Sequence, residues 1–78
     1  MNEYIQRIIA IIIEKTGIEP EDITEESYFG EDLNIAELEL VEILGIVEEE
    51  YSIVFEEGEV DNVKSVMDLV ELVFEKLE

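Results

Sequence analysis

Apolar residues recur at helical spacing near the start of the chain. The segment Tyr4–Thr16 has one apolar stripe, formed by Ile5, Ile8, Ile9 and Ile12. This spacing is typical of a helix that buries one face. Glu14 and Lys15 lie near the end of the segment, and Gly17 follows at the position where helices often end in a left-handed residue. The pattern predicts a first helix over residues 4–16.

The next segment, Ile18–Asn34, lacks helical periodicity. It contains Pro20 and Gly30, which interrupt regular structure. Its apolar residues are scattered and comprise Ile23, Tyr28, Phe29 and Leu33. Because a long connection usually wraps a core, we expect a loop held in place by these side chains, all of them buried.

The segment Ile35–Tyr51 has the most informative pattern. Its core face is predicted to consist of Leu40, Ile43, Leu44, Val47 and Tyr51. A second apolar strip lies nearly opposite, and we refer to its residues Leu38, Val41 and Gly45 as the docking strip. Glutamates border it, with Glu37 and Glu48 on one side and Glu42 and Glu49 on the other. An apolar strip with an acidic rim is typical of a surface that binds a partner, but a solvated helix face with two stray apolar residues has the same pattern.

The rest of the chain is predicted to hold a short helix and a long one. The segment Ser52–Val63 reads as a loop with at most one helical turn. Ser65 and Asp68 have nearly the spacing of a capping box, and the core stripe that follows is Val66, Leu69, Val70, Val73 and Leu77. The sequence therefore predicts an all-α fold in one domain, residues 1–78, with three long antiparallel helices and a short fourth one before the last.

Composition excludes most enzyme mechanisms. The 78 residues include no cysteine and no histidine, so thiolate nucleophiles, disulfides, imidazole acid–base chemistry and Cys or His metal sites are all absent. The longest apolar run, Ile8–Ile13, is too short for a membrane span. We expect a cytoplasmic protein that is not an enzyme.

The net charge of −19 sets the kind of partner. A charge of this sign repels nucleic acid and anionic membranes, so we expect neither as a partner and expect basic protein surfaces instead. Residues 19–61 contain seventeen acidic residues and no basic one, and the four cations outside are Arg7, Lys15, Lys64 and Lys76. Repulsion within this stretch should make stability rise with salt and with a fall in pH from neutral toward about 5.

The run from Glu31 to Glu42 reads Glu-Asp-Leu-Asn-Ile-Ala-Glu-Leu-Glu-Leu-Val-Glu, and the segment closes in Glu-Glu-Glu-Tyr at Tyr51. This resembles the acyl carrier protein signature, in which Asp-Leu-Gly leads into Asp-Ser-Leu at the start of the second helix and the helix closes in Glu-Glu-Glu-Phe. The resemblance continues ungapped to Val66–Val70 and covers nearly the whole chain. It implies a four-helix bundle of the acyl carrier protein type. It also implies a shuttle in fatty acid or polyketide-type biosynthesis, whose serine bears a phosphopantetheine arm that carries acyl thioesters.

The sequence departs from this family where the arm is attached. The resemblance places the Asp-Ser pair of the family at Ala36 and Glu37. Because a glutamate has no hydroxyl to form the phosphodiester, we expect no phosphopantetheine and no other cofactor. Asn34 replaces the usual glycine, and Gly45 replaces a bulky apolar residue in the docking strip. A first-turn glutamate is also favoured by the helix dipole alone, which accounts for Glu37 without a function.

We therefore expect a monomeric binding or regulatory module that docks on the basic surfaces of enzymes that recognise acyl carriers. Its partner-binding residues are predicted to be Glu37, Leu38, Val41, Glu42, Glu48 and Glu49. The alternative is a working acyl carrier with an altered site, or with the arm attached at Ser27, Ser52 or Ser65. An enzyme that uses carboxylates alone is a third, disfavoured hypothesis.

No metal site is predicted. A calcium loop that starts at Asp32 fails, because the glycine it needs at its sixth position is Glu37 and the glutamate it needs at its end is Ile43. Weak divalent binding by Glu48–Glu50 or by Glu56–Glu59 is left open.

Overall fold

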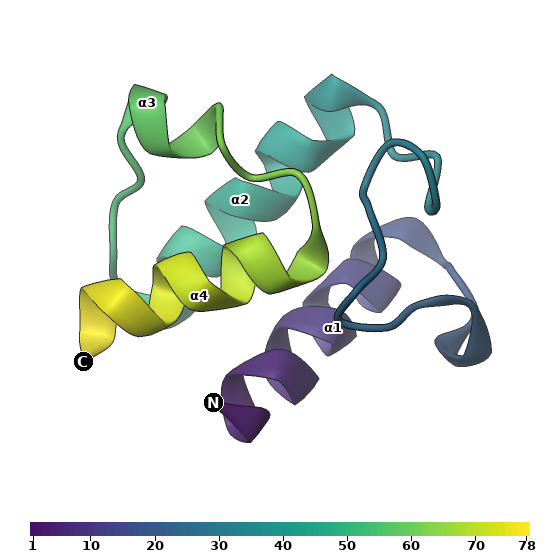
Figure 1. The fold of residues 1–78 in the computed structure, drawn as a ribbon, viewed down its shortest axis with the longest axis horizontal. Helices are drawn as coiled ribbons and strands as arrows, with labels where there is room; N and C mark the ends of the chain where they lie inside the picture. Colours follow the sequence, from purple (N-terminus) through teal and green to yellow (C-terminus); the bar gives the residue numbers. More distant parts are fainter.

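The computed structural model describes all residues from Met1 to Glu78. The chain forms α1 (Asn2–Thr16), a 3-10 turn η1 (Pro20–Asp22), α2 (Glu37–Tyr51), α3 (Glu57–Val60) and α4 (Val66–Leu77). In Figure 1 the three long helices pack together, and the single turn of α3 lies on the connection from α2 to α4. The prediction of an all-α fold with one short helix before the last is confirmed.

One continuous core joins the helices and the long first loop. α1 packs against both α2 and α4. The core contains 16 buried side chains, drawn from every long helix and from the segments between them. Four of them belong to the first loop and to the residues just before α2, and they are Ile23, Phe29, Leu33 and Ile35. The loop is therefore a structural part of the fold, as its scattered apolar residues predicted.

Two side chains that were predicted to be buried are exposed. Tyr28 is 48% exposed, because its backbone pairs with Ser65 in an isolated bridge of extended residues, and neighbouring side chains in extended backbone point to opposite sides. Phe29 takes the inward position and is buried. Leu77 is 39% exposed and is the last residue of α4, where the helix packs less closely on the core.

α2 begins two residues later than the sequence pattern indicated. Ile35 is buried but not helical, and its N–H donates to the carbonyl of Phe29 at 2.8 Å. Asn34 has a φ of 56° and Ala36 is extended, so the chain makes a sharp turn before the first residue of α2. Asparagine tolerates the left-handed region better than most residues, which explains why it can replace a glycine here.

Backbone hydrogen bonds attach the first loop to the start of α4. The N–H of Phe29 donates to Lys64 O at 2.9 Å, and the N–H of Val66 donates to Ser27 O at 3.0 Å. α4 starts with the predicted capping box, in which Ser65 Oγ accepts from the N–H of Asp68 and the Asp68 carboxylate accepts from the N–H of Ser65. These contacts fix the loop that leads into α2 and so place the start of that helix.

Candidate functional site

The docking strip lies on the side of α2 that faces away from the core. Leu38 is 74% exposed and Val41 is 52% exposed, whereas Ile43, Leu44 and Val47 on the other face are buried. Gly45 is half-buried and continues the strip by one more turn. The structure therefore brings the three strip residues together on one exposed face.

One apolar residue of this face was missed in the sequence. Ile46 is 38% exposed and borders the docking strip on the side of Glu42. It follows Gly45 directly, and its helical angle lies between the strip and the core face. The helical angle of Ile46 was the only signal in the sequence, and an angle between the two faces fits a buried side chain as well as an exposed one.

The start of α2 presents Glu37 to solvent. The N-cap residue is Ala36, whose side chain caps nothing, and Glu37 is the first helical residue. Glu39 also lies in the first turn, so two carboxylates stand at the end of the helix where unpaired N–H groups favour negative charge. Position 37 is thus an exposed position at a helix N-terminus.

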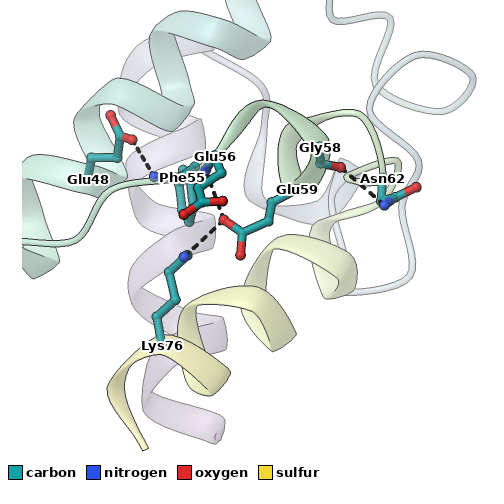
Figure 2. A network of polar contacts seen from close by, with 7 residues as sticks. All are labelled: Glu48, Phe55, Glu56, Gly58, Glu59, Asn62 and Lys76. Carbon is teal, nitrogen blue, oxygen red and sulfur yellow. Dashed lines mark hydrogen bonds and ion pairs between the residues drawn. The ribbon is translucent and has the colours of Figure 1, made fainter.

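The four predicted rim glutamates have different surroundings. Glu42 pairs with Lys15 of α1 at 3.0 Å. Glu48 is half-buried, and its carboxylate accepts a hydrogen bond of 2.7 Å from the N–H of Phe55, as Figure 2 shows. Glu37 and Glu49 are exposed and make no hydrogen bond or ion pair within the chain. Two carboxylates of the rim therefore have no partner within the chain, and two have contacts.

The remaining ion pairs also join different helices. Arg7 binds both carboxylate oxygens of Glu50 at 3.0 Å, and this contact holds the pKa of Glu50 below its ordinary value. Lys76 of α4 reaches Glu59 of α3 at 2.9 Å. The pKa of Glu59 is lowered first by the backbone N–H of Glu56 and then by Lys76, and Figure 2 shows the three groups together. Cations from outside residues 19–61 thus neutralise part of the acidic stretch.

Two of the three serines considered as attachment points are used by the fold. Ser27 is buried, and its Oγ accepts from the N–H of Thr24 at 3.0 Å. Ser65 is buried and caps α4. Ser52 is exposed, directly after the end of α2. Among these hydroxyls only that of Ser52 lies on the exposed surface.

No group of three or more acidic side chains in the structure is arranged to hold a metal ion. Divalent binding was considered at Glu48–Glu50 and at Glu56–Glu59, and carboxylates of both clusters have other contacts. Glu48 accepts from the N–H of Phe55, Glu50 pairs with Arg7, and Glu59 contacts Glu56 and Lys76.

The surface has two open hollows, one between α3 and α4 and one beside η1. Carboxylates line much of both hollows, and neither is an enclosed apolar cavity. No helix is long and apolar enough to cross a membrane.

The structure is a small helical bundle in which one acidic face of α2 is exposed to solvent. Two acyl carrier proteins resemble the chain along most of its length. That of Chlamydia muridarum is 34% identical over 67 residues, which cover 86% of this chain and 87% of the relative. That of Thermosynechococcus vestitus is 29% identical over 76 residues, which cover 97% and 94% respectively. No family model matches the chain. The chain belongs to the acyl carrier protein family.

Two residues at the start of α2 bear on the phosphopantetheine arm of the family. The resemblance puts the serine of the family at position 37, where this chain has an exposed carboxylate. A carboxylate cannot supply the hydroxyl oxygen of a phosphodiester. The preceding aspartate of the family is Ala36, whose methyl group makes no hydrogen bond at the start of α2.

Proposed function

We propose that this protein is a member of the acyl carrier protein family that works without phosphopantetheine and docks through α2 on basic surfaces of enzymes that recognise acyl carriers. It acts there as a decoy, a regulator or a subunit, and not as an enzyme. The supporting observation is the exposure of Leu38 and Val41 beside Glu37, at the helix end where the resemblance places the attachment site.

The physical argument combines apolar area and charge. Exposed apolar side chains with a polar rim are typical of the centre of a protein interface. Glu37 and Glu49 have no cation within the chain, so Lys or Arg side chains of a partner can pair with them without breaking an existing contact. The net charge of −19 increases the rate at which a basic surface finds this one.

Loss of the arm is tested by incubating the purified protein with coenzyme A and a phosphopantetheinyl transferase. We expect the intact mass to stay unchanged, because position 37 has no hydroxyl. The matched control is the double variant Ala36→Asp with Glu37→Ser, which restores both residues of the family and should accept the arm. Glu37→Ser alone should be modified poorly. A complete gain of one phosphopantetheine by the unaltered chain would refute the proposal and direct peptide mapping to Ser52.

Docking is tested by the affinity for a purified condensing enzyme that accepts acyl carriers, measured by calorimetry. Val41→Glu should weaken binding about tenfold, since the central side chains of an interface dominate its free energy. Val54→Glu is the control, because Val54 is 73% exposed and follows the far end of α2. Both variants add one negative charge. Equal losses in the two variants would show that charge alone governs the contact and would contradict docking at the strip.

A further inference from the structure

Gly45 is a glycine in the interior of a long helix. It is the ninth of the 15 residues of α2. At such a position glycine lowers the folding equilibrium constant about fivefold relative to alanine, because it gives up more backbone freedom on folding. A glycine at this position is explained either by packing within the molecule or by contact with another molecule.

Nothing inside the molecule requires it. The backbone at Gly45 does not have a positive φ, unlike that of Gly17 at the end of α1, where φ is 78°. A Cβ atom placed on Gly45 would meet no atom within 4 Å beyond its own helix backbone. Alanine would therefore fit, and the structure gains no packing from the missing side chain.

The surface around Gly45 is partly apolar and acidic. The residue lies on the docking strip, one turn beyond Val41, with the free carboxylate of Glu49 one turn further on. Without a Cβ, the helix backbone between Val41 and Glu49 can be approached closely by another molecule. An apolar side chain laid there would contact Val41 on one side, and cations next to it would meet Glu49 and Glu37.

We propose that Gly45 determines which partner binds the strip: it admits a basic protein helix that presents one bulky apolar side chain flanked by Lys or Arg. A side chain at position 45 excludes this partner by occupying the place of its apolar group. The inference rests on the proposed function, because it specifies the partner of the same docking strip. A second copy of this chain does not fit the description, since its charge is also −19.

Two synthetic helical peptides rich in Lys and Arg serve as probes, one with a central Phe and the other with Ala at that position. Binding to the full-length protein is measured by calorimetry at about 0.15 M salt, where contacts beyond about 8 Å are largely screened. The site is located by amide chemical shifts. We expect the Phe peptide to bind about fivefold more tightly than the Ala peptide and to shift amides of residues 37–49.

Gly45→Leu should reduce the Phe preference to about one, and Gly45→Ala should reduce it partly while raising the melting temperature. Gly58→Ala is the matched control, because Gly58 lies in α3 and a Cβ there also meets nothing within 4 Å. The control should keep the full preference. If neither peptide shifts the amides of α2 in the unaltered protein, the docking strip does not bind basic helices, and the proposed function is refuted as well. If the peptides bind on α2 and Gly45→Leu keeps the preference, the role of Gly45 is refuted and the docking surface stands.

Discussion

Ser52 is in a backbone conformation that costs the fold free energy. Its φ of 57° and ψ of 47° lie in the left-handed region, at the position that ends α2. The turn is useful, because the N–H groups of Ser52 and Ile53 both donate to the carbonyl of Glu48. A residue with a Cβ pays about 1–2 kcal/mol for this conformation. The Ser52 hydroxyl makes no hydrogen bond and the side chain is exposed, so the side chain itself adds no contact that offsets this cost.

Ser52→Gly should therefore stabilise the protein. Removing the Cβ removes the conformational cost in the folded state. Glycine also makes the unfolded chain more flexible, and this reduces the gain in stability by about 0.4–1 kcal/mol. The net gain in the free energy of unfolding is about 0.5–1 kcal/mol, which raises the melting temperature of a domain of this size by about 2–8 °C. Thermal unfolding followed by circular dichroism measures the shift. Urea unfolding should show a higher midpoint with an unchanged slope, because the buried area stays the same.

Two other positions provide controls for the same argument. Gly17→Ala should destabilise by about 1 kcal/mol, since Gly17 ends α1 with a φ of 78°. Asn34→Gly should gain less than Ser52→Gly, although the φ of Asn34 is 56°, because asparagine is tolerated in this region. A Ser52→Gly protein that melts at or below the wild-type temperature would refute the conformational reasoning.

Two further outcomes follow from the capping and charge contacts. Ser65→Ala removes the hydroxyl that caps α4 and should lower the free energy of unfolding by about 0.5–2 kcal/mol in urea titrations, with Ser52→Ala as the neutral comparison. The lowered pKa values of Glu50 and Glu59 mean that their contacts contribute fully above the unfolded value of 4.5 and are lost as the pH falls through the folded pKa. Repulsion within the acidic stretch also weakens as the pH falls, which has the opposite effect on stability, so the melting temperature should peak near pH 5. The difference between wild type and Glu50→Gln should vanish toward pH 3 and grow toward neutral pH, and a difference that stays constant with pH would contradict the assignment.

The helices could be predicted from the sequence because their signals are local. The apolar stripe of α1, the Ser65 cap and the single turn of α3 each depend on residues within a few positions of one another. The boundary of α2 could not be placed correctly, because Ile35 continues the apolar pattern although its N–H binds Phe29 in the preceding loop. The apolar pattern indicates which residues are buried. It does not indicate whether the N–H of a buried residue binds within the helix or to another segment, and that hydrogen bond decides where the helix begins.

Most of the apolar part of the candidate site was predictable, with the exception of Ile46, and the charged part was not. Leu38 and Val41 follow from helical angles alone. The position of the Glu48 carboxylate depends on Phe55, which reaches it only after the chain has turned at Ser52. Likewise, the partner of Glu42 is a lysine from a different helix. Contacts between distant segments of the chain decide which rim charges remain free, and no local spacing contains that information.

The ion pairs place three of the four cations of the chain where helices meet. Arg7 and Lys15 are eight residues apart on α1, and their partners Glu50 and Glu42 are eight residues apart on α2 in the reverse order. Eight residues span about 12 Å of helix, so the two pairs lie along one antiparallel seam. Lys76 joins α4 to α3 in the same way. Each of these cations thus reduces repulsion where two helices meet. At the docking strip Glu37 and Glu49 have no such partner within the chain, so the charge that remains there is available to a basic molecule from outside.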